Sequence, residues 1–387
     1  MADYTLIEQQ DDFDTFLSAH QHTPWLGFDT EFVGERRYLP LLCVLQIATE
    51  QGYYIVDTLA VSDLHGFAQL LERKDILKIT HAGENDYQLF YNNYGTLPHN
   101  VFDTQIAAGF MGYGYPTSFQ KLLEQELNVR ISKSQTVSDW AARPMSSKQV
   151  QYALNDVLHL RKLYDQMSAQ LQQDQKLTWA IEECEAQLTA ASAYERDDLR
   201  PLARYRNFHR LSLQQQVFML RLYRWREEQA RAQNISREMV LASKHLPAIV
   251  KLINSGKQTL LGDRRLPSKI VHKHWDTLSD LFNRRATDEE RELVTNIPRV
   301  PKRKPRQEIL MDILNQILKY RCIEYGVAPI LLLSRDELDR MKASKDYVPP
   351  QLLEGWRHQI LGDDLLAWVR RRERLALVVQ EGRVILE

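Results

Sequence analysis

The sequence predicts an α/β domain with a mixed sheet, followed by two small all-α domains. Over residues 1–165, apolar strand-like runs alternate with amphipathic helical segments. After about residue 207 the strand-like runs cease and long helical segments take their place. A chain of 387 residues also exceeds the roughly 100–200 residues of one domain, so we expect several domains.

The expected strands are apolar runs rich in β-branched and aromatic residues. Short links join the second, third and fourth runs, which favours an antiparallel meander, whereas the later alternation with helices favours parallel pairing. We therefore expect a mixed sheet flanked by helices. The runs are YTLIEQ (4–9), WLGFDTEF (25–32), LLCVLQIAT (41–49), YYIVDTL (53–59) and ILKITHAG (76–83).

The expected helices of this domain follow from apolar periodicity and from end signals. Gly95 is expected to end one helix, and Ser146 with Gln149 forms a capping-box pattern at the start of another. The segments are DDFDTFLSAH (11–20), DLHGFAQLLERKD (63–75), ENDYQLFYNNYG (84–95), SFQKLLEQELN (118–128) and SSKQVQYALNDVLHLRKLYDQM (146–167).

The second half of the chain shows a weak internal repeat. A long helical segment covers residues 210–234 and is followed by a loop and a shorter apolar helical stretch. A Pro-rich basic linker, PRVPKRKPR (298–306), comes next, and residues 307–341 repeat the same scheme. This architecture indicates two copies of a small helical domain.

The net charge of −1 averages two unlike halves. Residues 1–206 carry 17 Lys and Arg against 28 Asp and Glu, whereas residues 207–387 carry 33 against 23. An acidic half can hold cations, and a basic half can contact the phosphates of a polyanion. A basic helical surface is also common as a merely solvated surface, so the charge alone leaves both interpretations open.

Composition excludes several other classes of protein. The three cysteines are single and scattered, which fits neither a disulfide framework nor a zinc site and suits a reducing cytoplasm. No stretch approaches the ~20 apolar residues that span a bilayer, so we expect no membrane contact. The N-terminal residues lack the basic and apolar segments of a signal peptide, and we expect a cytoplasmic protein.

Four acidic residues and one tyrosine form the candidate site. Asp29 and Glu31 alternate on one strand and therefore face the same side. Asp86 lies on the helix of residues 84–95, and Tyr152 and Asp156 share a helix face at i and i+4. Carboxylates held this close repel each other unless a cation lies between them.

Hard oxygen ligands of this kind suit two divalent cations, Mg²⁺ or Mn²⁺. One ion would be held by Asp29, Glu31 and Asp156, and the second by Asp29 and Asp86. Ions about 4 Å apart can flank an in-line displacement at phosphorus. Tyr152 would donate or accept a hydrogen bond with the attacking water and so orient it. The expected reaction removes nucleoside 5′-monophosphates from a 3′ end.

Each of these patterns is common by itself, and only their combination and order are specific. DTEF (29–32), HAGENDYQLF (81–90) and YALNDV (152–157) resemble the three exonuclease motifs of the DEDD superfamily, in its tyrosine-containing branch. Residues 28–48 and 133–157 resemble the ribonuclease D family in particular. The C-terminal half resembles two tandem HRDC domains, although the first copy lacks the proline usual before its apolar run.

The resemblance implies a ribonuclease H-like 3′-5′ exonuclease domain over residues 1–205 and HRDC domains over 210–290 and 300–375. It implies an exoribonuclease with Asp29, Glu31, Asp86 and Asp156 as metal ligands and Tyr152 as the water-positioning residue. Trimming the 3′ ends of tRNA precursors and other stable RNAs would be its task, with no obligate protein partner evident.

Two rival functions stay open. A 3′-5′ DNA exonuclease of repair or proofreading type could use the same four acids, but no helicase phosphate loop is present. A catalytically inactive nucleic-acid-binding module is disfavoured by the complete set of acids.

Neighbouring residues are expected to be mainly structural. We expect hydrogen-bonding roles for His81 and Asp103, and packing with a helix-end ion pair for Trp140 and Arg143. Two further positions lie close to the acidic motifs. Phe32 could pack in the core or stack on a terminal base, and Lys133 could contact a phosphate or simply be exposed. Trp225 is expected to anchor the core of the first small helical domain.

Overall fold

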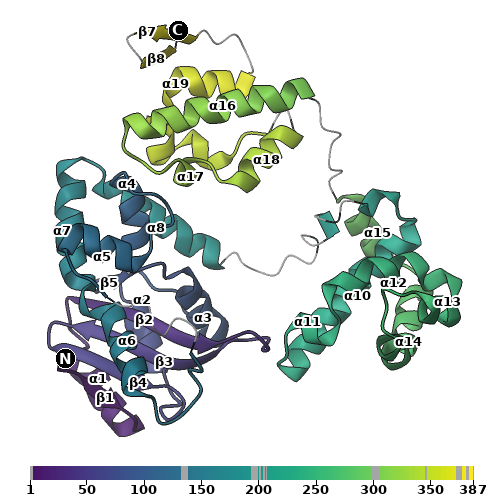
Figure 1. Cartoon of the computed structure of the whole chain (residues 1–387), viewed down its shortest axis with the longest axis horizontal. Helices are drawn as coiled ribbons and strands as arrows, with labels where there is room; N and C mark the ends of the chain where they lie inside the picture. The colour runs from purple at the N-terminus through teal and green to yellow at the C-terminus, as the bar shows by residue number, and fades with distance from the viewer. Residues whose placement is uncertain are drawn as a thin grey trace. The chain divides into compact units, whose positions relative to one another are not determined.

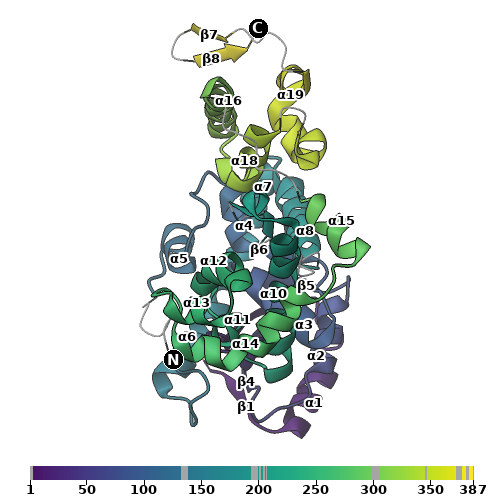
Figure 2. The same ribbon diagram turned by 90° about the vertical axis from the view of Figure 1, so that its right-hand side faces the viewer.

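The computed structural model describes residues 3–131, 138–192, 199, 202–203, 205, 207–297, 305–344, 347–371, 377–380 and 383–386. They form two compact units (Figures 1 and 2). The first unit comprises Met1–Phe32, Leu42–Ala193 and Pro301–Glu387. The second comprises Val33–Leu41 and Tyr194–Val300. Among the described helices, none combines the length and apolar character needed to cross a membrane.

The first unit is built on a six-stranded sheet with the strand order β1-β4-β3-β2-β5-β6. β1 pairs with β4, β2 with β5 and β5 with β6 in parallel, whereas β3 pairs with β4 antiparallel. The expected mixed sheet is therefore confirmed. The strands are β1 (Thr5–Ile7), β2 (Trp25–Val33), β3 (Leu41–Thr49), β4 (Gly52–Asp57), β5 (Leu77–Thr80) and β6 (Val101–Asp103).

Helices cover both faces of this sheet. On one face, α1 (Gln10–Ala19), α2 (His65–Glu72) and α3 (Glu84–Tyr94) contribute aromatic residues to a core with Phe28 and Leu45 of the strands. On the other face, α6 (Ser147–Leu158) and α7 (Leu160–Gln173) pack on Trp25, Ala48 and Ile79. Because side chains alternate along a strand, neighbouring residues of β2 and β3 pack in the cores on opposite faces of the sheet.

The remaining helices of the α/β part are α4 (Thr104–Phe110), α5 (Phe119–Leu127) and α8 (Leu177–Ser192). A helical bundle formed by the C-terminal part of the chain packs against α4 and α8 within this unit. Its elements are α16 (Pro305–Glu324), α17 (Pro329–Leu332), α18 (Arg335–Ala343), the short helix η4 (Pro350–Leu353) and α19 (Gly355–Arg371), with the hairpin β7 (Leu377–Gln380) and β8 (Arg383–Leu386). Figure 2 shows α16 and α19 beside each other.

One continuous hydrophobic core joins this bundle to the α/β part. The Trp356 and Phe110 rings meet edge to face with centroids 4.9 Å apart, and Trp356 Nε1 donates to Glu183 at 3.1 Å. Gly109 allows a close approach, because a Cβ there would lie 2.5 Å from Leu331 Cδ1. The Ala328 N–H also donates to the Gly109 carbonyl at 2.7 Å. The C-terminal bundle is therefore an integral part of the first unit.

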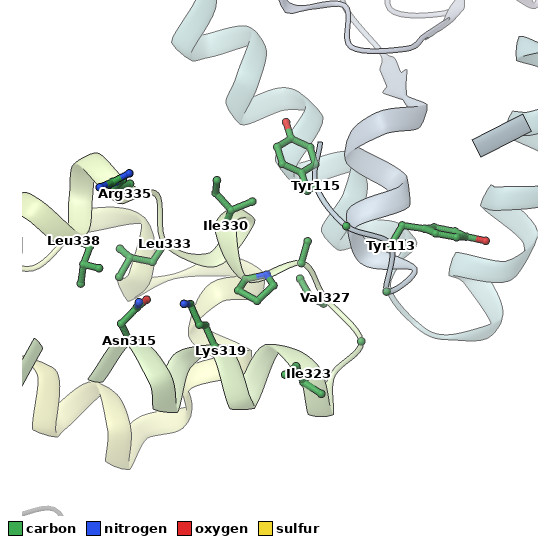
Figure 3. Close-up of a pocket in the computed structure, with 15 residues that line it drawn as sticks. Tyr113, Tyr115, Asn315, Lys319, Ile323, Val327, Ile330, Leu333, Arg335 and Leu338 are labelled. Atoms are coloured by element: carbon green, nitrogen blue, oxygen red, sulfur yellow. The ribbon is translucent and has the colours of Figure 1, made fainter. Parts of the chain in front are cut away.

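A cavity of about 640 Å³ lies along this junction (Figure 3). The loop Gly112–Tyr115 after α4 forms one side, and α16, α17 and the start of α18 form the other. Apolar side chains such as Ile330 and Leu333 line it together with the cations of Lys319 and Arg335. The cavity thus combines an apolar surface with positive charge.

The second unit is helical. Its elements are α10 (Leu213–Gln233), α11 (Arg237–Val240), α12 (Leu246–Leu252), α13 (Lys257–Gly262), α14 (Ser268–Asn283) and α15 (Asp288–Thr295), with the short helices η1 (Phe208–Arg210), η2 (Ser243–His245) and η3 (Ile253–Ser255). Trp225 is partly buried against the core of this unit. The boundaries of three successive domains at residues 205, 210–290 and 300–375 stay predictions.

Part of the positive charge of the second unit is used internally. Arg221 is buried and pairs with Glu290 at 2.6 Å, and it also donates to the Leu281 carbonyl at 2.8 Å. Arg226 is buried and pairs with Glu238 at 2.8 Å. These two guanidinium groups therefore stabilise the helical unit and are not available to bind a polyanion.

The second unit also holds the segment Val33–Leu41, which follows β2. The Tyr38 hydroxyl donates to the Glu227 carboxylate, and the Leu39 N–H donates to Asn234 Oδ1 at 3.2 Å. The Ser236 N–H donates to the Arg36 carbonyl at 3.0 Å. These contacts make the segment Val33–Leu41 part of the helical unit.

Candidate metal centre

Three of the acidic residues meet at one point. Asp29 and Glu31 lie on β2, and Asp156 lies on α6, which packs over the same face of the sheet. One carboxylate oxygen of each residue lies within 4.8 Å of the others. Strand alternation and one helix thus build a cluster of three acids from two distant segments.

Asp86 reaches the cluster from α3 and is buried. The Thr30 hydroxyl, between the two acids of β2, donates a hydrogen bond to Asp86. The charge of Asp86 acts on Asp29, Glu31 and Asp156, because it raises the pKa of each. All four predicted acids therefore belong to one electrostatic cluster.

Burial is the main reason why these carboxylates resist ionisation. It raises the pKa of Glu31 to about 8 and those of Asp86 and Asp156 to about 7, with repulsion from neighbouring acids as a further cause. The same causes raise the pKa of Asp29 well above its ordinary value. Cations bound between these carboxylates would offset both the cost of burying their charges and the repulsion between them.

One further observation fits a cation at this place. Asp156 Oδ2 is buried and has no hydrogen-bond partner among the described residues. A buried carboxylate oxygen without a donor is costly, and a bound cation is one way to satisfy it. The oxygen-only donor set matches the preference of Mg²⁺ and Mn²⁺.

Asp103 fixes the turn that leads into α3 and hence to Asp86. Its carboxylate accepts the N–H groups of Ala82 at 3.0 Å and Gly83 at 2.8 Å, and it caps α4 through the Gln105 N–H at 2.8 Å. Ala82 has a φ of 58°, an uncommon conformation that these hydrogen bonds hold. The structural role expected for Asp103 is confirmed.

His81 also has the structural role expected for it. Its Nδ1 contacts the Thr104 hydroxyl at 2.9 Å, and its Nε2 contacts the Thr117 carbonyl at 3.1 Å. Burial lowers the pKa of the imidazole. Both ring nitrogens are therefore committed to neighbours.

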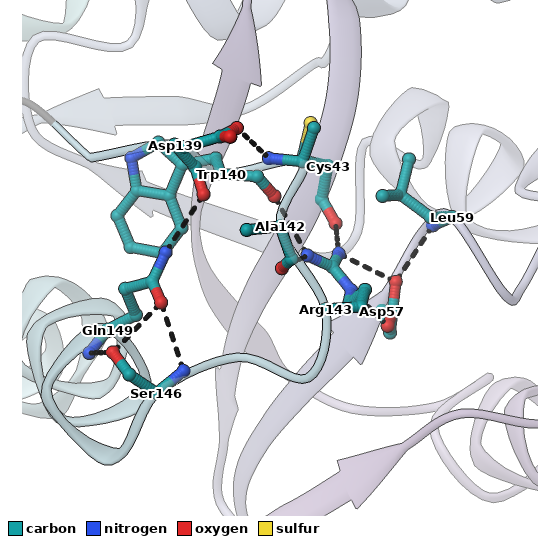
Figure 4. A network of polar contacts seen from close by, with 10 residues as sticks. Cys43, Asp57, Leu59, Asp139, Trp140, Ala142, Arg143, Ser146 and Gln149 are labelled. Carbon is teal, nitrogen blue, oxygen red and sulfur yellow. Dashed lines mark hydrogen bonds and ion pairs between the residues drawn. The ribbon is translucent and has the colours of Figure 1, made fainter.

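The start of α6 is anchored to the sheet by Arg143 (Figure 4). Its guanidinium binds the buried carboxylate of Asp57 on β4, with one contact at 2.7 Å, and donates to the Cys43 carbonyl on β3 at 2.8 Å. It also donates to the Trp140 carbonyl at 2.8 Å. This ion pair joins the loop before α6 to the sheet, whereas the sequence suggested an ion pair at a helix end.

The first turn of α6 is closed by the expected capping box. Ser146 Oγ accepts the Gln149 N–H at 3.3 Å, and Gln149 Oε1 accepts the Ser146 N–H at 3.0 Å. Trp140 is buried and its ring lies 6.0 Å from that of Tyr152, one turn before Asp156. The anchored loop and the cap together set the position of the Tyr152 and Asp156 face.

Two other predicted positions have different outcomes. Phe32 is half-buried and packs against the core, which favours the packing role. Lys133 lies outside the described residues. Sequence analysis did not single out Thr30 or Gln46, a buried amide on β3, because neither is a carboxylate or a tyrosine, although both lie in motif-bearing stretches.

Comparison with known proteins identifies the family. A family model described as a 3′-5′ exonuclease matches residues 4–172. Ribonuclease D of Nitrobacter hamburgensis is 31% identical over 366 residues, which cover 94% of each chain. Ribonuclease D of Pseudomonas paraeruginosa is 31% identical over 348 residues, and the alignment covers 89% of this chain and 91% of that protein.

The fold agrees with these sequence relatives. The crystal structure of Escherichia coli RNase D matches with a TM-score of 0.79 and 24% identity, covering 94% of this chain and 98% of the other. The coverage includes residues of both units, so the fold of the chain is similar to that of this solved structure. The chain is thus a nuclease with a 3′-5′ exonuclease domain, and it belongs to the ribonuclease D family.

Proposed function

We propose that this chain is a divalent-cation-dependent 3′-5′ exoribonuclease that releases nucleoside 5′-monophosphates from RNA with a free 3′ end. The proposal rests above all on the cluster of Asp29, Glu31 and Asp156, whose carboxylate oxygens lie within 4.8 Å of one another. Such a half-buried cluster in a 3′-5′ exonuclease fold suits hydrolysis of phosphodiesters.

The residues have distinct roles in this proposal. Asp29, Glu31 and Asp156 would hold one Mg²⁺ or Mn²⁺, and Asp29 with Asp86 would hold a second. Bound cations would lower the pKa of the attacking water and offset the charge on the leaving oxygen. Tyr152, on the same helix face as Asp156, would orient that water through a hydrogen bond.

The proposed substrates are tRNA precursors and other stable RNAs in the cytoplasm. Support comes from the relatives named ribonuclease D, and from the cavity lined by Lys319 and Arg335. Arginine and lysine beside apolar surface suit the phosphates and bases of a single strand. We further propose that the two helical regions are HRDC domains that enlarge the RNA-binding surface.

The test compares end-labelled single-stranded RNA with the matching DNA, in Mg²⁺ and in EDTA. Stepwise loss of nucleotides from the RNA 3′ end, abolished by EDTA, is expected. Asp29→Ala and Asp156→Asn should abolish this turnover and leave RNA binding largely intact. Asp165→Asn is the matched control, because Asp165 is exposed on α7 in a pair with Arg161.

Each alternative function has its own outcome in this assay. Equal or faster loss from DNA would favour a DNA exonuclease. Binding of RNA with no hydrolysis, and no uptake of Mn²⁺, would favour an inactive binding module. Wild-type turnover by the Asp29→Ala or Asp156→Asn variant would refute the assignment of the site.

A further inference from the structure

Gln46 is a buried amide whose polar atoms are unsatisfied within the described part of the chain. It lies on β3, its side chain is fully buried, and neither Oε1 nor Nε2 has a hydrogen-bond partner among the described residues. Leaving a buried polar group unpaired costs about 1–3 kcal/mol. A glutamine in this position therefore requires an explanation beyond packing.

The side chain of Gln46 points to the α6 face of the sheet. Leu45 and Ile47, its neighbours on β3, pack in the core on the α1, α2 and α3 side. Ala48, two residues on, packs with Val157 and Leu160 on the other side. Because side chains alternate along a strand, Gln46 lies on the same face as Ala48.

The approach of Gly27 to Ala48 indicates that Gln46 lies opposite Asp29. β2 and β3 are neighbours in the sheet and are joined by a short loop, which only an antiparallel pair permits. A Cβ built on Gly27 would lie 3.6 Å from the Ala48 Cβ, so these two residues face each other. In an antiparallel pair, the residue two positions after Gly27 faces the residue two positions before Ala48. Asp29 therefore faces Gln46, and such facing residues typically have Cβ atoms about 4.5–5.5 Å apart.

Helix α6 brings Asp156 to the same place. Leu160 lies over Gly27, with Cδ1 at 3.0 Å from a Cβ built there. Asp156 lies near the end of α6, four residues before Leu160 at the start of α7, and one of its carboxylate oxygens lies within 4.8 Å of one of Asp29. Two buried groups without hydrogen-bond partners among the described residues, the Gln46 amide and Asp156 Oδ2, therefore belong to the same small region.

We infer that Gln46 is a positioning residue of the cation site, whose side-chain N–H groups donate to the carboxylates of Asp29 and Asp156 when these bind cations. This inference rests on the proposed two-cation function. A carboxylate that gives one oxygen to a cation is oriented by a donor on its other oxygen. An amide supplies that donor without the positive charge of Lys or Arg, which would compete with the cation.

The test is Gln46→Met, which keeps the length of the side chain and removes both polar atoms. Mn²⁺ binding to the full chain without RNA is measured by titration calorimetry, and unfolding is measured in EDTA. We expect the Mn²⁺ dissociation constant to rise roughly 10- to 100-fold, the usual effect of losing a group that orients a metal ligand. The unfolding midpoint in EDTA should stay equal or rise, because an unpaired buried amide is removed.

Ile47→Val is the matched control, because Ile47 is buried beside Gln46 but on the opposite face. It should lower the unfolding midpoint and leave Mn²⁺ binding unchanged. Gln46→Leu serves as a second variant if Gln46→Met does not fold. If neither variant folds, Gln46 has a packing role and the inference fails.

The outcomes separate this inference from the proposed function. A Gln46→Met dissociation constant within twofold of the wild-type value would overturn the role of Gln46 and leave the two-cation proposal intact. Failure of the wild-type chain to bind Mn²⁺ would overturn the two-cation proposal, and the role of Gln46 with it.

Discussion

Replacing Asp156 by Asn should stabilise the protein in the absence of divalent cations, although it removes activity. Asp156 is half-buried, with its Oδ2 fully buried, and three other acids lie nearby; its pKa rises from 3.8 to about 7. At neutral pH the folded protein therefore bears the cost of a partly ionised, unpaired carboxylate. Asn has nearly the same shape and cannot ionise, so it removes that cost.

The magnitude follows from the pKa. A shift of about three units, at about 1.36 kcal/mol per unit, corresponds to roughly 4 kcal/mol above pH 7. Because protonation is shared among neighbouring acids, we expect a gain of roughly 1–4 kcal/mol. For a folded unit of this size, that gain raises the unfolding midpoint by several degrees.

The dependence on pH has a definite sign. The pKa of Asp156 is higher in the folded than in the unfolded state, so the wild-type chain keeps full stability below about pH 3.8 and loses it as the pH rises through about 7. The advantage of Asp156→Asn in EDTA should therefore grow between pH 5 and pH 8. Mn²⁺ at 100 times its dissociation constant should restore about 2.7 kcal/mol to the wild-type chain, and much less to the variant.

Thermal unfolding at pH 5 and pH 8, in EDTA and in Mn²⁺, measures these quantities. Asp165→Asn serves as the control for loss of one negative charge on the surface. The reasoning would be refuted if Asp156→Asn unfolded below the wild-type temperature at pH 8 in EDTA, or if its advantage were the same at both pH values.

Three other perturbations test separate features. Arg143→Ala should cost about 3–5 kcal/mol in urea unfolding, because it leaves the buried Asp57 carboxylate unpaired. Glu290→Gln should make the stability of the helical unit depend less on pH in the acid range. Hydrogen bonds from Arg221 lower the pKa of Glu290 to about 2. The stabilisation by Glu290 is therefore present above its ordinary pKa and is lost as the pH falls toward 2. Lys319→Ala and Arg335→Ala should each weaken RNA binding and reduce the slope of log affinity against log salt by about 0.7 for each phosphate that is no longer neutralised.

Each of these predictions has a contradicting result. Arg143→Ala should be compared with Arg130→Ala, which breaks an exposed pair with Glu124, and equal losses would contradict the role of burial. If Glu290→Gln unfolded in acid at the same pH and with the same steepness as the wild type, the proposed link between the lowered pKa of Glu290 and stability would be contradicted. An unchanged salt slope in both cavity variants would remove the cavity from the RNA-binding surface.

The local features of the site were predictable from short-range patterns. Alternation along a strand put Asp29 and Glu31 on one face, and helical spacing aligned Tyr152 with Asp156. The capping box at Ser146 and the left-handed Gly95 at the end of α3 were also readable in sequence. These features depend on neighbours within a few residues, so periodicity and end signals suffice.

Long-range partners were not predictable in this way. Nothing near Arg143 indicates that Asp57 is its partner 86 positions away, because that choice depends on where β4 meets the loop before α6. The joint core of α4, α8 and the C-terminal bundle was likewise missed. A helix period identifies an apolar face but does not say which surface covers it.

The sequence by itself determined the mixed sheet, the two helical regions and the acidic residues that form the candidate site. Only the tertiary structure decided that Arg221 and Arg226 serve internal ion pairs, that Asp103 holds the turn before α3, and that Gln46 lies opposite Asp29 with no hydrogen-bond partner among the described residues. The physical reason is that a residue's type and spacing fix its local conformation, whereas its hydrogen-bond partners and its electrostatic environment depend on segments that meet only when the chain has folded.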